Sequence, residues 1–222
     1  MGWGDKPDAM ELSTSLPEEY EERMLSASLD CNRGAADGDA CHAVGEFFAV
    51  IRKDYVKARE AYGANCDERK HGASCFGLGR LLLGGKGGGA DEKAGEAAFD
   101  KGCALGHGPS CHHLGLLEFK RKDDTKALGH LETACGAGDP GSCYLLGSYF
   151  LKPGKSKAPL KAKTFLETAC ADGHAPACHN LAVMFKNGDA GVPKDEAKFD
   201  TYAKRTRALV DAAGAARGVK VA

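Results

Sequence analysis

Apolar and small residues recur along the chain in one pattern, which is clearest in residues 131–150. Leu131 opens the motif LETAC, a turn of seven residues follows, and a second motif, CYLLG, begins at Cys143. Both motifs return in altered form at residues 166–182, and three weaker copies precede them. In each second motif an apolar residue lies three positions after the cysteine, on the same face of an α-helix. The pattern predicts pairs of short antiparallel helices joined by tight turns.

Five helix pairs follow from this alignment, with one more helix before them that runs from Pro17 to about Cys31. The first helices are expected to begin near residues 40, 74, 110, 142 and 177, and the second helices near 54, 91, 123, 159 and 194. Ser74, Ser110 and Ser142 are N-cap candidates for three of the first helices. A glycine or alanine four positions after each second cysteine is expected to let the partner helix approach closely.

The copies recur at intervals of 35, 37, 32 and 35 residues. A fixed period of this size is typical of helical-repeat solenoids, in which each unit buries its apolar face on its neighbours. The predicted fold is therefore an all-α, right-handed superhelical solenoid. Residues 1–16 are interpreted as an N-terminal arm, 17–213 as five repeats preceded by one helix, and 214–222 as a C-terminal tail. The glycine-rich segment 84–89 (GGKGGG) is expected to be a flexible turn.

All ten cysteines of the chain fall at the turns between repeats. A cysteine at the end of one helix and another at the start of the next lie within disulfide reach. Buried free thiols are one alternative, and a metal site is another, although zinc ligands are usually two to four residues apart. Each bridge would contribute about 2.5 kcal/mol in the chain-entropy model. The predicted pairs are Cys31–Cys41, Cys66–Cys75, Cys103–Cys111, Cys135–Cys143 and Cys170–Cys178.

Charge and cysteine content limit the function and the compartment. The net charge of −1 and a pI near 6.7 argue against a nucleic-acid partner, and no apolar run is long enough to span a membrane. Ten paired cysteines indicate an oxidising compartment. Residues 1–23 are acidic and show neither a hydrophobic signal core nor an Arg-rich targeting helix. These features predict the mitochondrial intermembrane space, with a secreted protein whose signal has been removed as the alternative.

The sequence offers no recognisable catalytic set, so a non-enzymatic protein is expected. It has no Gly-x-Ser-x-Gly motif and no complete phosphate loop. One position is more informative, because every repeat carries a planar ring directly after the second cysteine. These rings either pack between helices or line a concave groove that holds a partner segment or a flat ligand. Covalent haem attachment would need Cys-x-x-Cys-His, which is absent, whereas non-covalent haem ligation by a histidine is left open. The candidate partner-binding residues are His42, Phe76, His112, Tyr144 and His179.

The connecting segment 188–197 (GDAGVPKDEA) and the Gly-His pairs at 106–107 and 173–174 resemble the Sel1-like repeat family, a relative of the tetratricopeptide repeat. The cysteine at the end of each second helix is similar to the disulfide-rich branch of that family. Residues 51–66, 85–88 and 194–198 resemble mitochondrial members that assemble cytochrome c oxidase. The resemblance implies an assembly factor or accessory subunit whose partners are respiratory-complex subunits. It further implies contact with the inner membrane only through such a complex.

Two other function classes are weighed beside this one. Some secreted or periplasmic cysteine-rich repeat proteins of bacteria are assigned penicillin-binding or β-lactamase activity, but the chain has no Ser-x-x-Lys motif of such enzymes. A thiol oxidoreductase usually carries a close-spaced Cys-x-x-Cys pair in an electropositive setting. The wider pairs here favour structural bridges.

Overall fold

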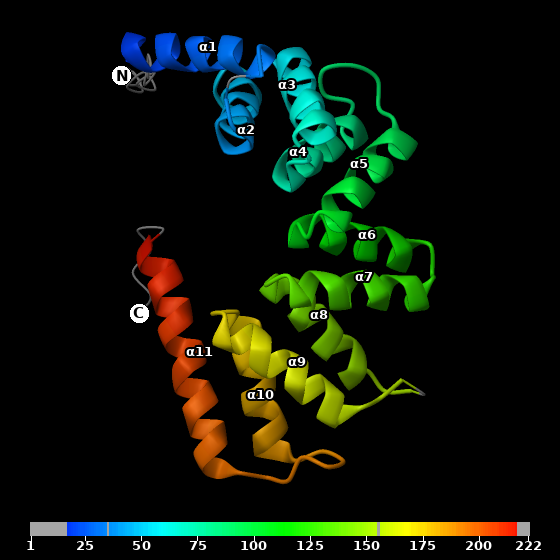
Figure 1. Cartoon of the computed structure of the whole chain (residues 1–222). Coiled ribbons are helices and arrows are strands. Elements are labelled where there is room, and N and C mark those ends of the chain that lie inside the picture. Colours follow the sequence, from blue (N-terminus) through cyan, green and yellow to red (C-terminus); the bar gives the residue numbers. More distant parts are fainter. Residues whose placement is uncertain (1–16, 35, 155, 217–222) are drawn as a thin grey trace, which may run out of the picture.

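The computed structural model describes residues 17–34, 36–154 and 156–216 as a curved array of helices (Figure 1). A short π-helical turn, η1, extends α2, and an isolated β-bridge between Asp189 and Val192 closes the last long loop. The elements are α1 (Glu18–Asn32), α2 (Gly38–Glu46), η1 (Phe47–Ile51), α3 (Tyr55–Glu68), α4 (Gly72–Leu83), α5 (Glu92–Ala104), α6 (Gly108–Lys120), α7 (Asp124–Gly136), α8 (Pro140–Leu151), α9 (Pro159–Ala171), α10 (Ala175–Asn187) and α11 (Glu196–Ala216).

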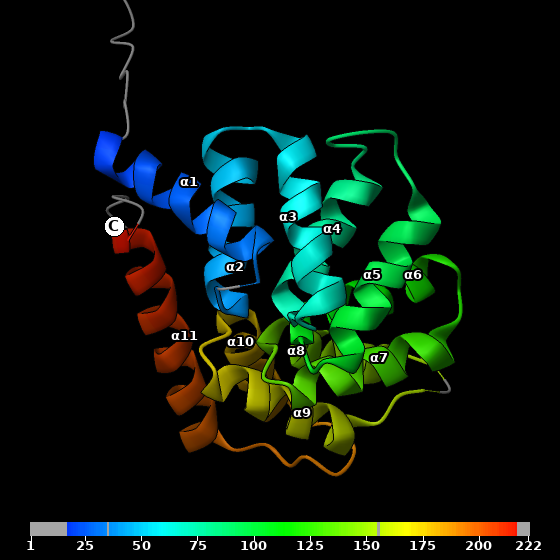
Figure 2. The ribbon, with the colours of Figure 1, turned by 45° about the horizontal axis from the view of Figure 1, so that its top comes forward.

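Each repeat is an antiparallel pair, and the pairs follow one another around a curve that brings α1 and α11 to the same side of the molecule (Figures 1 and 2). The first helices α2, α4, α6, α8 and α10 contact one another along much of the array, in addition to their own second helices. We call the surface that they form the first-helix face. The all-α repeat solenoid expected from the sequence is confirmed.

Close packing within each pair depends on the small residue four positions after the second cysteine. A Cβ atom at Gly147 would lie 2.6 Å from Leu166, and one at Gly79 would lie 2.7 Å from Phe99. The equivalent pairs in the other early repeats are Gly45 with Tyr62 and Gly115 with Leu131. The bulky partner is always four residues before the first cysteine and is fully buried. The predicted role of this glycine is confirmed.

The five disulfides have the predicted pairing, and no cysteine of the chain is free. Each bridge joins the end of one second helix, or of α1, to the start of the next first helix. The Cα atoms lie 5.5 Å apart in the first bridge and 4.7–4.8 Å apart in the others. The bridges therefore connect neighbouring repeats and not the two helices of one repeat.

The serine N-caps expected at three first helices are wrong. The helices begin two residues earlier, at Gly72, Gly108 and Pro140, so that each serine is the third helical residue. His71 and Asp139 are N-caps, and their side chains accept hydrogen bonds from the backbone N–H groups of Ser74 and Ser142. The serine side chains are fully buried and make contacts between repeats instead.

The C-terminal end of the last helix differs slightly from the boundary predicted from the sequence. Helix α11 continues to Ala216, three residues past the expected end of the repeats at residue 213. The proposed arm at 1–16 and residues 217–222 of the proposed tail lie outside the described residues. Within residues 17–34, 36–154 and 156–216, no helix has both the length and the apolar character needed to cross a membrane.

We expect Gly147→Ala to destabilise the protein by about 1–3 kcal/mol, because the added methyl group must displace Leu166 from a fully packed site. Gly129→Ala is the matched control, since a Cβ at Gly129 in α7 meets no atom within 4 Å. That control should be neutral or more stable by up to about 1 kcal/mol, because alanine favours a helix over glycine. Chemical denaturation of the oxidised proteins measures both, and equal stabilities of the two variants would contradict this account.

Candidate functional site

In the first four repeats, the ring after the second cysteine contacts the N-cap of the next repeat. The His42 and His71 rings have centroids 5.1 Å apart, those of Phe76 and His107 are 5.4 Å apart, and those of Tyr144 and His174 are stacked at 4.6 Å. His112 instead places Nδ1 3.0 Å from a carboxylate oxygen of Asp139. The fifth ring, His179, is exposed in the last repeat. Four of the five candidate residues therefore lie at junctions between consecutive first helices.

His42 belongs to a buried hydrogen-bond network that crosses the first junction. The Ser74 hydroxyl oxygen lies 2.7 Å from the Asn65 amide nitrogen and 3.0 Å from Nδ1 of both His42 and His71. The backbone N–H of Ser74 donates to Nδ1 of His71, so this nitrogen is an acceptor. We therefore assign the Ser74 hydroxyl proton to the bond with His71, while His42 Nδ1–H and Asn65 donate to Ser74. The hydroxyl then donates one hydrogen bond and accepts two.

Serine, histidine and aspartate meet in this network, but they cannot act as a hydrolytic triad. His71 bridges Ser74 and Asp39, with Nε2 3.0 Å from the Asp39 carboxylate. The side chain of Ser74 has no exposed surface, and Asn65 occupies another of its lone pairs. A nucleophile must reach a substrate atom, so these residues hold the two repeats together.

The junction between the third and fourth repeats uses the same positions with different chemistry. His112 Nδ1 lies 2.8 Å from the Ser142 hydroxyl and 3.0 Å from Asp139. Asp139 also accepts the backbone N–H of Ser142 at 2.7 Å. The Asp139 carboxylate thus caps α8 and also contacts the histidine of the preceding repeat.

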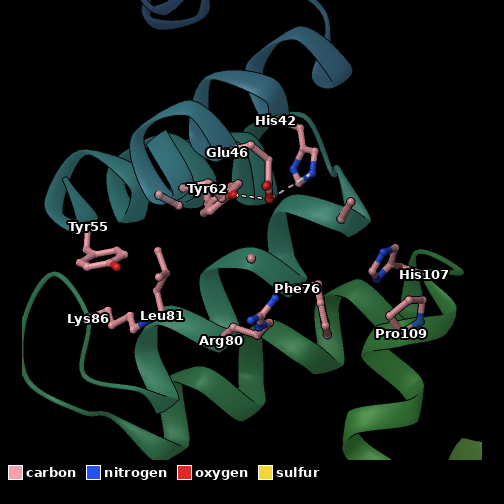
Figure 3. A pocket seen from close by; sticks show the side chains of 14 residues that line it. His42, Glu46, Tyr55, Tyr62, Phe76, Arg80, Leu81, Lys86, His107 and Pro109 are labelled. Atoms are coloured by element: carbon pink, nitrogen blue, oxygen red, sulfur yellow. Dashed lines mark hydrogen bonds and ion pairs between the residues drawn. The ribbon is translucent and has the colours of Figure 1, made fainter. Parts of the chain in front are cut away.

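A hollow of about 360 Å³ opens on the first-helix face between α2 and α4 (Figure 3). On one side the Tyr62 hydroxyl donates to Glu46 at 2.6 Å, and the same carboxylate oxygen lies 3.9 Å from Nε2 of His42. Arg80 and Lys86 lie on the opposite side (Figure 3). The hollow therefore contains an imidazole ring and a hydrogen-bonded carboxylate facing two cations.

Burial controls the ionisation of these groups. Burial lowers the pKa of His42 below its ordinary value of 6.5, and the nearby His71 lowers it further, against the opposing effect of Glu46 and Asp39. Burial first, and then the hydrogen bond to Glu46, raises the pKa of Tyr62 well above its ordinary value of 10.0. Tyr62 is therefore a neutral donor near neutral pH. Within the part of the chain that the structure describes, no three His, Cys, Asp or Glu side chains are grouped to bind a metal ion.

Sequence patterns identified only two of the residues that define the hollow, His42 and Phe76. Tyr62 occupies a position where the other repeats have Phe99, Leu131 and Leu166, so it resembles an ordinary core residue. Lys86 lies in the glycine-rich segment that fails as a phosphate loop. Arg80 and Glu46 carry no motif. Only the contact between two repeats brings these side chains together.

Comparisons with known proteins agree with the repeat architecture. The fold is similar to a Sel1 repeat protein from Oxalobacter formigenes, with a TM-score of 0.75 at 18% identity, covering 87% of this chain and 57% of that one. It is also similar to c5321, a protective antigen of uropathogenic Escherichia coli, with a TM-score of 0.70 at 21% identity, covering 86% and 42%. The chain spans less than two thirds of both bacterial structures, and these likenesses show the fold alone.

The family model for the Sel1 repeat matches residues 72–107, 103–139, 140–174 and 175–198, and the chain belongs to the Sel1 repeat family. It is 36% identical over 208 residues to cytochrome c oxidase assembly factor 7 of Homo sapiens, covering 86% of this chain and 90% of the relative. The mouse protein of that name is 39% identical over 202 residues, covering 85% and 87%. The Danio rerio protein is 31% identical over 217 residues, covering 92% and 91%.

Because Tyr144 lies at a repeat junction and His179 does not, removing these two rings should lower the free energy of unfolding by different amounts. Tyr144→Ala should lower the free energy of unfolding by about 1–2 kcal/mol, because it removes a half-buried ring stacked on His174 of the next repeat. His179→Ala should change it by less than about 0.5 kcal/mol, since this ring is exposed and stacks on no N-cap within the described residues. Thermal or urea unfolding of the two variants tests the difference. A larger effect at His179 would show that the ring position does not act through repeat junctions.

Stability should fall in mild acid because of the half-buried histidines. Burial lowers the pKa of His42, His107, His113 and His174 in the folded protein. Below their ordinary value of 6.5 the unfolded chain therefore binds protons more readily, and stability that is present above this pH is lost as the pH falls. His42→Asn should show a shallower decline of melting temperature between about pH 7.5 and 5.5. Parallel profiles for His42→Asn and the wild-type protein would contradict the assignment.

Proposed function

We propose that this protein is a non-enzymatic, disulfide-stabilised repeat scaffold that acts in the assembly of cytochrome c oxidase in the mitochondrial intermembrane space. The observation that carries the proposal is similarity to proteins named cytochrome c oxidase assembly factor 7 over most of the chain and most of each relative. The similarity includes the repeat units on which the fold depends.

The disulfides support the compartment. Four bridges join consecutive repeats and a fifth joins α1 to the first repeat, and bridges of this kind persist where the surroundings are oxidising. The cytosol and the mitochondrial matrix are kept reducing, so the intermembrane space is the mitochondrial compartment that suits the chain. Rupture of the outer membrane alone should make the protein accessible to added protease.

The burial of the bridges supports a structural role for the cysteines. The second cysteine of each bridge is at most 2% exposed, and Cys66 and Cys170 are buried as well, which hinders the in-line approach of a thiolate to these sulfurs. Reactive disulfides of oxidoreductases present an accessible sulfur. We accordingly assign a structural role to the bridges, which hold the solenoid together.

Partner binding is assigned to the first-helix face, because the first helices carry the rings His42, Phe76, His112, Tyr144 and His179. The partners are proteins, namely subunits of a respiratory complex. Half-buried rings stiffened by a neighbouring repeat offer contact area at low cost in conformational entropy. The junction contacts and partner binding are compatible, because each of these rings retains some exposed surface.

Depletion of the protein in its own organism tests the proposal. The amount of assembled cytochrome c oxidase on native gels, and its activity relative to other respiratory complexes, should fall and should recover with the wild-type chain. A transient assembly factor should be absent from the mature complex, whereas an accessory subunit should migrate with it. Unchanged cytochrome c oxidase after complete depletion would reject the assignment.

A further inference from the structure

The hollow between α2 and α4 presents two cations to which the described residues supply no acidic partner. Arg80 and Lys86 are both exposed, and neither takes part in an ion pair within residues 17–34, 36–154 and 156–216. Most exposed cations on the second helices differ in this respect: Lys101 pairs with Asp67, and Lys161 pairs with Glu132. Arg80 and Lys86 therefore bring two positive charges without an ion pair together at the hollow.

Both cations are held in place by aromatic rings. The guanidinium carbon of Arg80 lies 5.8 Å from the centroid of Phe76, and Nζ of Lys86 lies 4.9 Å from the centroid of Tyr55. A cation stacked on a ring keeps its N–H donors free at the edge of the contact. The rings thus orient the charges without neutralising them.

The glycine-rich segment that carries Lys86 is packed against α3, so the expectation of a flexible turn is wrong. Gly87 has a φ of +77°, and a Cβ atom there would lie 2.2 Å from the carbonyl oxygen of Tyr55. The backbone N–H of Lys86 donates to the carbonyl of Leu81 at 2.9 Å. Only glycine allows this close approach, which seats the segment on the start of α3 and places Lys86 over Tyr55.

The rest of the hollow suits an extended chain more than a small anion. The one carboxylate in its lining, Glu46, accepts a hydrogen bond from the Tyr62 hydroxyl and forms no ion pair with Arg80 or Lys86. Val50 lines one edge and is 60% exposed, and the neighbouring Ile51 is 44% exposed. Positive charges beside exposed apolar side chains are complementary to a segment that carries both carboxylates and apolar residues.

We infer that this hollow docks an extended acidic segment of a partner protein, with its carboxylates on Arg80 and Lys86 and an apolar side chain beside Val50. The inference deepens the proposed function, on which it rests, because an assembly factor must bind a client or another factor. It assigns the contact to one place, the junction of the first two repeats.

Fluorescence anisotropy with defined peptides tests the site directly. The probe is a labelled peptide rich in glutamate with spaced leucines, and the matched peptide has glutamine at each glutamate. The oxidised full-length protein should bind the acidic peptide more tightly, with an affinity that falls as salt is added. The double variant R80Q/K86Q should bind it roughly tenfold more weakly.

The double variant K126Q/K161Q is the control, because it removes the same charge from exposed positions on α7 and α9. It should bind the acidic peptide as the wild-type protein does. Equal affinity for the two peptides, or equal losses in the two double variants, would overturn the inference. Binding to vesicles of anionic lipid that is lost in R80Q/K86Q, without selectivity between the peptides, would assign the cations to a membrane surface and would also overturn it.

A rescue experiment separates failure of this inference from failure of the proposed function. In depleted cells the wild-type chain and K126Q/K161Q should restore cytochrome c oxidase, whereas R80Q/K86Q at equal abundance should restore it only partly. Full rescue by R80Q/K86Q would reject the hollow while leaving the proposed function intact. No loss of the enzyme on depletion would reject the proposed function itself, whatever the peptides show.

Discussion

The short turn from one repeat to the next is the constraint on which the whole structure depends. A solenoid has no central core, so its stability is the sum of repeat stabilities and of contacts between neighbours. Here each turn is crossed by a disulfide, with the Cα atoms of four of the five bridges 4.7–4.8 Å apart. In the chain-entropy model a bridge over such a short loop contributes about 2–3 kcal/mol, mainly by restricting the unfolded chain. The bridge also fixes where the next first helix begins.

Because the start of each first helix is fixed, its N-cap residue both begins the helix and contacts the ring of the preceding repeat. A residue with positive φ directly precedes the N-cap in four turns, as Gly106, Gly138 and Gly173 show, and Lys70 adopts the same conformation with a φ of 55°. The N-cap then lies beside the ring of the preceding repeat. A histidine or aspartate at this point can hydrogen-bond or stack with that ring. Planar rings recur after the second cysteine because the geometry of the turn presents them with the same neighbour each time.

The period, the disulfides and the helix-packing glycines were predictable because each depends on local spacing or on covalent geometry. The serine caps were not, since Ser74 and Ser142 meet histidines from the preceding repeat, about 30 residues away in sequence. The hollow could not be predicted from the sequence pattern either. Its carboxylate, hydroxyl and cations come from α2, α3, α4 and the segment after α4, and only the packing of two repeats brings them together. The glycines of segment 84–89 suggested mobility, whereas they permit a close backbone contact.

One glycine leaves room for the hollow at the junction of the first two repeats. The residue two positions after the second cysteine faces the preceding first helix, and in the third repeat it is His113, whose ring lies 5.1 Å from those of both Phe76 and Phe99. In the second repeat it is Gly77, where a Cβ atom would lie 2.9 Å from the Tyr62 ring. A side chain at Gly77 would fill the gap and displace Tyr62 from Glu46. The repeat pattern therefore builds similar junctions, and the absence of a side chain at Gly77 leaves the space that the hollow occupies in this one.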